Sequence, residues 1–451
     1  MVHGRGLVAS RDISPGECLF VIPSIVSAPV DEVRRRFLEL SSTDSGGNEL
    51  EQITESVLVE QIQHLQDEED DCEDREYKQI IHHSFLSQMS SDDMPQTNLD
   101  VVLAKSSNTD NQSSNKRGDT ETILSNIRRN AFGPDYHNYD AIASWWLNNS
   151  SNSSIGLVYT RLLGIYPLAA MINHSCYPNA VRIFGTLPTS YSEATTLAGL
   201  MGREVMIVHA STTIKKGVEI TWSYIPPTTP FNSRHELLRT KYGFSCQCVR
   251  CTNEQPAIAS GSADLSEVLQ QADDWSVSRA AKRTEHHAED NTRLREIVQQ
   301  LEHSFTSING ETQRQLRVGY ASIYMEYFNA ALSSPSIKSS PDEISNLLKL
   351  AMQLHFSFVS CNNASTEHLS ILHLCYELSS LMHTRAMSYF PDTTNKTMSQ
   401  VRFWTEQLKQ AHTIRYGSLG GDLERVRYVM KHSRAVLRNR DGWYVVKDRF
   451  I

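Results

Sequence analysis

A tight cluster of cysteines constrains the fold of this chain more than any other feature of its sequence. Cys246, Cys248 and Cys251 form a Cys-x-Cys-x-x-Cys segment of six residues, whereas the other five of the eight cysteines are scattered. In a reducing compartment, thiols this close together indicate metal ligation rather than disulfide bonds. A structural zinc site takes four soft or borderline ligands in a tetrahedron, so one loop would supply three of them.

The fourth ligand would have to come from a distant part of the chain. Cys176 is the first candidate and His174 the second, since both stand in the Asn-His-Ser-Cys segment at 173–176. A distant fourth ligand would tie the cysteine loop to the rest of the fold and make metal binding part of folding. The alternative, three unligated thiols on a loop, is disfavoured because such thiols are prone to oxidation.

Length, charge and hydropathy narrow the classes of protein that the chain can belong to. Its 451 residues predict two or three domains. A formal net charge of -9 gives no overall basic field, so we expect no direct nucleic-acid binding. No apolar run follows a basic start, and the most apolar stretch, 162–172, is shorter than the ~20 residues that span a bilayer. We therefore expect no membrane association and a location in the cytoplasm, the nucleus or both, and a disulfide-rich secreted protein is disfavoured.

Short apolar runs bounded by turn residues predict β-strands at both ends of the first half of the chain. A Ser-Pro-Gly turn at 14–16 separates the first two runs, and a Lys-Lys-Gly turn at 215–217 precedes the last. The runs lie at 7–9, 19–22, 181–184, 205–208 and 219–222. This pattern favours a mostly β domain with irregular loops.

After Cys251 the apolar residues recur at helical spacing. One helix has a well-marked start, with Ser340 as the N-cap, Pro341 as the first helical residue and Glu343 as the capping-box partner. The predicted helices cover 316–328, 344–358, 369–381, 401–411 and 423–436. Stacked antiparallel helices are therefore expected in the second half of the chain.

Three motifs in this order resemble a SET domain followed by its post-SET zinc loop. They are Asn-His-Ser-Cys-x-Pro-Asn at 173–179, Glu-Ile-Thr-x-x-Tyr at 219–224 and the cysteine segment at 246–251. The Tyr-Gly-Phe sequence at 242–244 and the helical C-terminal region are similar to the SMYD branch of this family. The opening Gly-x-Gly-Leu at 4–7 and the Asn-x-Phe at 130–132 fit the same branch.

The resemblance implies an α+β fold in which a SET-domain β core and a post-SET zinc loop precede a C-terminal helical domain of TPR-like style. The segment 87–120 is expected to be flexible, because its polar composition buries too little apolar surface to offset chain entropy. The implied regions are N-terminal SET strands at 1–28, a partly helical insertion at 29–125, the SET core at 126–226, the zinc-binding region at 227–256 and the helical domain at 257–451.

The same resemblance implies a site for S-adenosylmethionine and a site for zinc. Tyr224 would lie beside the transferred methyl group, and Tyr242 would help form an aromatic channel for the substrate lysine. The implied contacts to the methyl donor are Gly4, Arg5, Gly6, Asn130, Asn173, His174, Tyr224 and Phe244. The implied zinc ligands are Cys176, Cys246, Cys248 and Cys251.

The chemistry of methyl transfer agrees with these residue types. A neutral amine displaces a sulfonium in line, so the protein mainly aligns the reactants. An apolar aromatic channel disfavours the charged form of lysine, and aromatic rings attract a sulfonium. We expect Tyr224 to orient the amine or polarise the methyl group, with general base as the weaker alternative. The expected substrate is a lysine in a histone or another protein; the alternative is a catalytically silent SET-derived scaffold that binds a partner.

Two departures from the SMYD pattern limit what the resemblance implies. Residues 29–125 hold one cysteine, Cys72, so the MYND zinc finger usual at this place is absent. Arg5 stands where many relatives carry asparagine. Partner or DNA contacts of a MYND finger are therefore not expected here.

Overall fold

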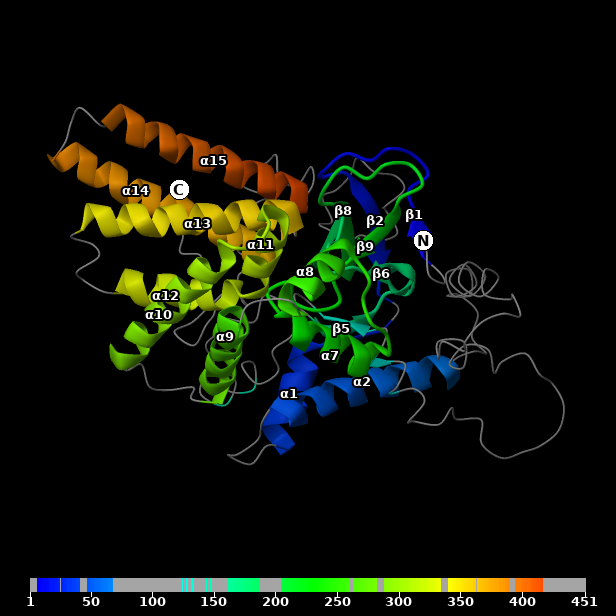
Figure 1. Ribbon diagram of the computed structural model, residues 1–451. Coiled ribbons are helices and arrows are strands. Elements are labelled where there is room, and N and C mark those ends of the chain that lie inside the picture. The colour runs from blue at the N-terminus through cyan, green and yellow to red at the C-terminus, as the bar shows by residue number, and fades with distance from the viewer. Residues whose placement is uncertain are drawn as a thin grey trace.

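The computed structural model describes a strand-rich region and a larger helical region that lie side by side (Figure 1). The described residues are 6–24, 26–40, 47–67, 131–133, 161–186, 204–259, 263–281, 288–333, 340–361, 363–389 and 394–416, with the single positions 124, 127, 128, 143 and 147. Several predictions lie outside these residues, namely Gly4, Arg5, Asn130, the flexible segment 87–120 and the helix over 423–436. The predicted α+β class is confirmed, while the predicted domain boundaries stay predictions.

Among the described residues the strands form small three-stranded sheets. The first sheet joins β1 (Leu7–Val8), β9 (Glu219–Trp222) and β6 (Asn173–His174), with β6 parallel to β9. The second joins β2 (Cys18–Pro23), β8 (Glu204–Ala210) and β7 (Ala180–Thr186), all antiparallel. The third joins β3 (Val26–Pro29), β5 (Arg161–Ile165) and β4 (Ala131–Phe132). A short 3-10 helix, η2 (Pro167–Met171), leads from β5 to β6.

The strands predicted at 7–9, 19–22, 181–184, 205–208 and 219–222 are confirmed as parts of β1, β2, β7, β8 and β9. The two predicted turns are also present, and each turns at a glycine with a φ of +82°, Gly16 and Gly217. This left-handed conformation strains residues that carry a Cβ, so the Pro-Gly and Lys-Gly signals located these turns for a physical reason.

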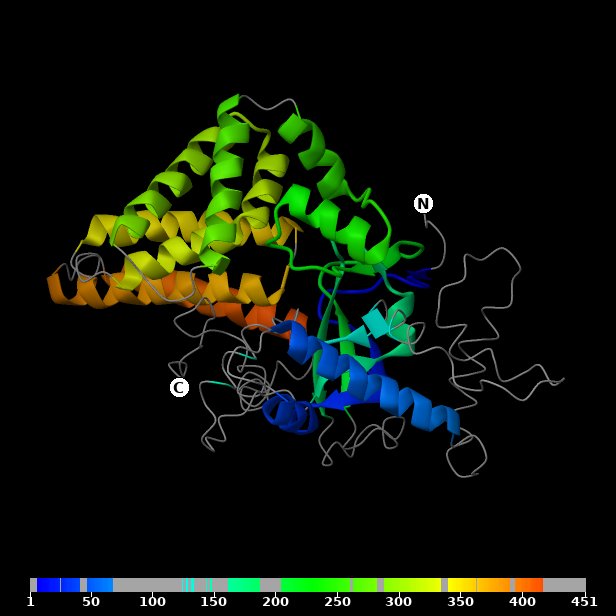
Figure 2. The same ribbon diagram turned by 90° about the horizontal axis from the view of Figure 1, so that it is seen from below.

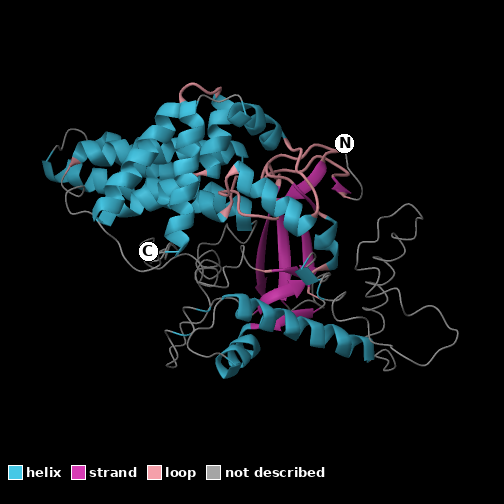
Figure 3. Ribbon diagram, turned by 60° about the horizontal axis from the view of Figure 1, so that its bottom comes forward, coloured by secondary structure: helices cyan, strands magenta, loops and turns pink. Residues whose placement is uncertain are grey.

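Two helices from the predicted insertion pack on the third sheet. The helices α1 (Val30–Leu40) and α2 (Gly47–Asp67) lie below the strands in Figure 3. Apolar side chains of both helices, such as Phe37 and Leu58, share one core with Leu162 of β5. The guanidinium of Arg128 pairs with the buried Glu55 of α2 at 2.8 Å. At least this part of the insertion is therefore built into the strand-rich region.

The helical region begins with α7 (Phe231–Tyr242) and α8 (Val249–Ala259) and ends with three long helices packed in sequence order. These are α13 (Pro341–Cys361), α14 (Thr366–Tyr389) and α15 (Thr394–Tyr416), seen edge-on in Figure 2. Between the two groups lie α9 (Ala263–Ala281), α10 (Ala288–Phe305), α11 (Gly310–Gly319) and α12 (Ala321–Ser333). None of the described helices is long and apolar enough to cross a membrane.

The strand β8 contributes to two different cores. Val205 and Ile207 pack in the core of the helical region, whereas Met206 and Val208 pack in the core beneath the first two sheets. Successive side chains of a strand point to opposite faces, so both faces of β8 are buried. The helix α15 also contacts β7 and β8 directly.

The predicted helix starts and breaks can be checked residue by residue. The start of α13 is confirmed at Pro341, and the Ser340 hydroxyl accepts the backbone N–H of Glu343 at 3.4 Å. The patterns at 369–381 and 401–411 fall within α14 and α15. The single helix predicted over 316–328 is wrong, because α11 ends at Gly319 and α12 begins at Ala321.

The end of α11 is marked by its backbone hydrogen bonds and by a close neighbour. The backbone N–H of Tyr320 caps α11 by bonding the carbonyls of Leu316 and Arg317, both at 3.2 Å. A Cβ at Gly319 would lie 3.2 Å from a guanidinium nitrogen of Arg250, which is tighter than most such contacts. The buried arginine therefore occupies the space beside the end of α11, and apolar periodicity does not reveal this.

Candidate active site and metal centre

The four predicted metal ligands come together in the folded chain. Cys176 follows β6, Cys246 and Cys248 lie between α7 and α8, and Cys251 lies in the first turn of α8. Their sulfur atoms all lie within 4.8 Å of one another. A tetrahedral zinc site with Zn–S bonds of ~2.3 Å has edges of about 3.8 Å, so small side-chain shifts would complete the shell. Among the described residues, this is the group that could hold a metal ion.

His174, the second candidate for the fourth ligand, takes a different place. Its Nδ1 accepts the backbone N–H of Tyr224 at 2.9 Å, and its Nε2 lies 3.1 Å from the sulfur of Cys176. Burial lowers the pKa of His174, so the ring is neutral. We assign its one proton to Nε2, because Nδ1 acts as an acceptor. The imidazole therefore donates to a sulfur ligand rather than competing for the metal.

One glycine brings the end of α7 back toward both sites. Gly243 follows Tyr242 with a φ of +76°, and its N–H bonds the carbonyl of Arg239 at 3.1 Å. A left-handed residue is the usual way to end a helix and reverse the chain. The reversal places Phe244 beside His174 and leads the chain on to Cys246.

The predicted aromatic residues form one cluster. The ring centroids of Tyr224 and Tyr242 lie 5.0 Å apart, and His174 lies 5.2 Å from Tyr224. Phe244 lies 5.8 Å from His174 and 6.4 Å from Tyr224. These separations are typical of stabilising aromatic pairs. Residues from β6, from the segment after β9 and from the end of α7 therefore line one apolar site.

The hydroxyl of Tyr224 is fixed in this cluster. It donates to the backbone carbonyl of Ile172 at 2.8 Å, and the backbone N–H of the same tyrosine bonds His174. Burial raises the pKa of Tyr224, and Tyr242 raises it further. Burial also raises the pKa of Tyr242. Both hydroxyls therefore stay protonated at neutral pH.

Asn173 lies where the N-terminal segment, β6 and β9 meet. Its side-chain amide donates to Oε1 of Glu219 at 2.7 Å. A Cβ at Gly6 would lie 2.5 Å from that oxygen and 2.7 Å from the amide nitrogen. Glycine at position 6 thus lets the backbone there lie against the Asn173–Glu219 pair.

Sequence reasoning gave no role to Glu219 or Asn179, although both stand in the quoted motifs. The amide of Asn179 donates to the carbonyl of Glu219 at 2.8 Å and accepts the N–H of Thr221 at 2.9 Å. These two hydrogen bonds hold β9 in place, and with it the start of the segment that carries Tyr224. Their positions were the available signal, because Asn179 ends the motif at 173–179 and Glu219 begins the motif at 219–224.

Arg182 is a further residue that sequence reasoning missed. Its guanidinium lies 5.0 Å from the ring of Trp222 and 5.7 Å from that of Phe132, and it donates to the Ser223 carbonyl at 3.1 Å. Arg182 interrupts the apolar residues of β7, between Val181 and Ile183. A charged residue inside an apolar strand was the signal that could have identified it. Phe132, which belongs to the predicted Asn-x-Phe element, thus lies close to the segment before Tyr224.

Comparison with known proteins agrees with these motifs. The family model described as "SET domain" matches residues 4–225. Histone-lysine N-methyltransferase ASHR2 of Arabidopsis thaliana is 28% identical over 34% of this chain and 32% of its own length. N-lysine methyltransferase SMYD2 of Homo sapiens is 34% identical over 20% of this chain and 17% of its own. Histone-lysine N-methyltransferase ASHR1 of Arabidopsis thaliana is 36% identical over 20% of this chain and 15% of its own.

The matched segments therefore span less than a third of the length of these relatives. The family match, by contrast, runs from the Gly-x-Gly opening to Ile225. It encloses Asn173, His174, Cys176 and Tyr224, and the cysteine segment at 246–251 follows after α7 and meets Cys176 in the folded chain. The motifs, their meeting point and the family match coincide: residues 4–225, just under half of the chain, match the SET domain, and the chain resembles the SMYD branch.

Proposed function

We propose that the chain transfers a methyl group from S-adenosylmethionine to the ε-amine of a lysine in a protein substrate. The observation that carries the proposal is the contact between Tyr224 and Tyr242 beside His174 and Asn173. All of these residues except Tyr242 lie within the SET-domain match. The relatives are named as lysine methyltransferases of histones or other proteins, which supports both substrate classes. We propose the cytoplasm, the nucleus or both as its location.

S-adenosylmethionine would supply a methyl group on a sulfonium, and its displacement needs no nucleophilic side chain. Gly6 and Asn173 would hold the donor on one side of the site, and His174 and Phe244 on the other. A side chain at Gly6 would displace the side-chain ends of Glu219 and Asn173, so glycine there keeps Asn173 in its place. Gly4, Arg5 and Asn130 stay predicted donor contacts.

Tyr224 would orient the substrate amine. Its proton is committed to the Ile172 carbonyl, so its oxygen lone pairs remain to accept a hydrogen bond from the amine. Its raised pKa argues against a general base, because a protonated phenol cannot take a proton. The apolar rings around it favour the neutral form of the incoming lysine.

We propose zinc as the metal held by the four cysteines. Four thiolates match its preferred ligand set and leave no position open for water or substrate. The ion would therefore be structural, tying the segment at 246–251 to Cys176. Phe244 and Tyr242 lie just before that segment, so the metal would also position the aromatic cluster.

The first test is calorimetric binding of S-adenosylmethionine to the zinc-loaded protein. Asn173→Ala should weaken binding by at least about tenfold, because the residue meets the donor directly. The matched control is Asn232→Ala, since Asn232 is exposed on α7. No binding by folded, zinc-containing wild type would contradict the enzyme proposal and favour the scaffold alternative.

The second test measures transfer of a labelled methyl group to core histones and, separately, to a pool of non-histone proteins. Tyr224→Phe should lower the rate by at least about tenfold while S-adenosylmethionine still binds. A rate unchanged by this variant would remove the orienting role from Tyr224. The control variant is Tyr376→Phe, since Tyr376 lies in α14 outside the site.

A further inference from the structure

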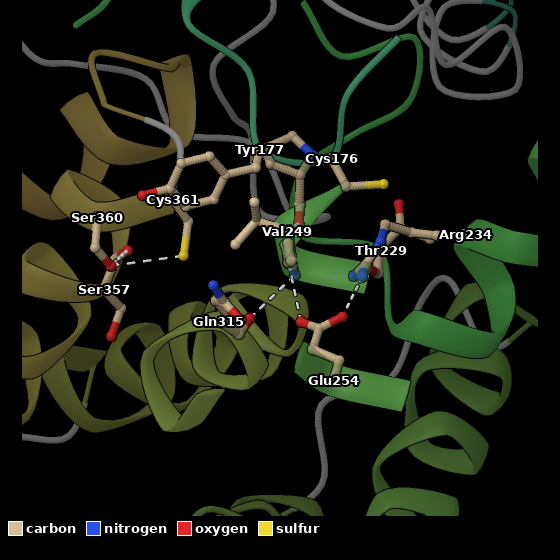
Figure 4. A network of polar contacts seen from close by, with 12 residues as sticks. Cys176, Tyr177, Thr229, Arg234, Val249, Glu254, Gln315, Ser357, Ser360 and Cys361 are labelled. Carbon is tan, nitrogen blue, oxygen red and sulfur yellow. Dashed lines mark hydrogen bonds and ion pairs between the residues drawn. The ribbon is translucent and has the colours of Figure 1, made fainter. Parts of the chain in front are cut away.

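Three charged side chains lie fully inside the protein where α7, α8 and α11 meet. Arg234 is 1% exposed, and Arg250 and Glu254 are 0% exposed. Both arginines bind the Glu254 carboxylate, Arg250 at 2.9 Å. We call these residues the charged triad; Figure 4 shows Glu254 at its centre. Two guanidiniums and one carboxylate leave one positive charge buried, which is costly unless a nearby group balances it.

The cysteine cluster lies next to this charge. Cys251 directly follows Arg250 in the first turn of α8, and Glu254 lies on the same helix, so α8 carries one cysteine ligand and two members of the triad. A divalent ion held by four thiolates leaves a net charge of about -2, since each thiol loses its proton on binding. The charge of the triad is therefore opposite to that of the metal-bound cluster.

The triad also contacts α11, further along the helical region. Arg250 donates to the carbonyl of Pro227 at 2.9 Å and to that of Gln315 in α11 at 3.1 Å. Gln315 lies in the second half of α11, where a cation interacts favourably with the helix dipole. Gly319, the last residue of the helix, provides the space for the guanidinium.

A second contact joins the metal site to the same helices. Tyr177, directly after Cys176, packs against the core of the helical region. Its ring lies beside Cys361 at the end of α13 (Figure 4). The surroundings of the cysteine cluster are therefore joined to α11 through Arg250 and to α13 through Tyr177.

We propose that the charged triad couples metal binding to the docking of α11 on α8, so that loss of the metal releases this helix. Arg234 and Arg250 are then positioning residues for the metal centre. The inference rests on the proposed metal site and not on methyl transfer.

The test uses the full chain and needs no substrate. Metal content is measured first, and amide hydrogen exchange is then compared between the zinc-loaded protein and protein stripped with a chelator. Exchange in α11 should rise by at least about tenfold on stripping, and exchange in the far half of α14 should change far less. An equal rise in both helices, or none in α11, overturns the coupling. A protein that binds no zinc overturns the metal site as well, which separates the two failures.

Two variants test the role of the triad itself. Arg234→Met should release zinc to a chromogenic chelator at least about tenfold faster than wild type. Arg239→Met is the matched control, because Arg239 lies on the same helix but pairs with Glu236 at the surface. Equal release from both variants contradicts the proposal. If Arg234→Met does not fold, Arg234→Lys keeps the charge and should release zinc more slowly than a folded Arg234→Gln.

A glycine pair in α11 tests the coupling without changing any charge. Gly319→Ala would press on Arg250 and should speed both zinc release and exchange in α11. Gly310→Ala at the other end of the helix meets only Arg314 at 3.8 Å, an ordinary contact, and should do neither. Identical behaviour of the two variants would overturn the link between Arg250 and the metal.

Discussion

Arginine–glutamate clusters occur in two regions of the molecule, and their geometry is similar while their surroundings differ. Between α1 and α2, Arg36 bonds Glu32 at 2.7 Å and Glu60 at 2.6 Å, with side chains 27%, 33% and 55% exposed. The charged triad makes bonds of the same kind with side chains that are at most 1% exposed. Water already satisfies the first cluster, whereas only the protein satisfies the second. Burial, rather than the number of ion pairs, therefore decides what each cluster contributes to stability.

The largest effect is expected from Glu254→Gln. The variant removes the carboxylate and leaves two buried guanidiniums side by side, which should cost about 3–5 kcal/mol of unfolding free energy. Urea unfolding of the zinc-loaded protein, followed by circular dichroism, measures this. A loss below about 1 kcal/mol, the range of surface pairs, would remove the contrast between the two clusters.

An intermediate effect is expected from a buried pair that carries no charge. The backbone N–H of Ala364 donates to Nδ1 of His368, so we assign the proton of His368 to Nε2, which lies 3.0 Å from Nδ1 of His355. Burial lowers the pKa of His355 from its ordinary value of 6.5 to about 4, and lowers the pKa of His368 well below 6.5. Both rings are therefore neutral in the folded protein at pH 7.

Stability should then fall with pH. Between pH 6.5 and about 4 the unfolded chain binds a proton that folded His355 does not, so the contribution present above pH 6.5 is lost as the pH falls toward 4. The expected loss from His355 is about 3 kcal/mol. Unfolding midpoints of wild type and His355→Leu across this range measure it, and the variant should show the shallower pH dependence. Parallel curves would contradict the assignment.

The smallest effect is expected from Arg36→Met. The cluster on α1 and α2 is solvated, so its loss should cost less than about 1 kcal/mol, and salt at about 1 M should weaken the wild-type contribution further. Unfolding of the variant at low and high salt measures both. A cost close to that of Glu254→Gln would show that burial does not separate the two regions.

Local patterns in the sequence predicted much of the strand region and the candidate site. Turn glycines and apolar runs located the strands, and the motif order located Tyr224, Phe244 and the cysteines. Each of these signals is carried by residues that are neighbours in the sequence, as are the ligands Cys246 and Cys248. Only the fourth ligand, Cys176, required the resemblance to choose between it and His174.

The charged triad could not be predicted in the same way. Arg234 and Glu254 lie 20 residues apart, and Arg250 bonds a carbonyl 65 residues away. In sequence each resembles a charged residue on the solvated face of a helix. The break at Tyr320 was also missed, because apolar residues recur at helical spacing across it.

Alternate side chains of β8 belong to different cores, and this has a consequence for truncated forms of the protein. A fragment that ended at Ile225 would keep Met206 and Val208 covered but would expose Val205, Ile207 and their neighbour Ile183 as one hydrophobic patch. Such patches on strands promote aggregation. We therefore expect that residues 4–225 do not form a stable protein by themselves. A fusion or truncation should retain the helices that cover this face of β8.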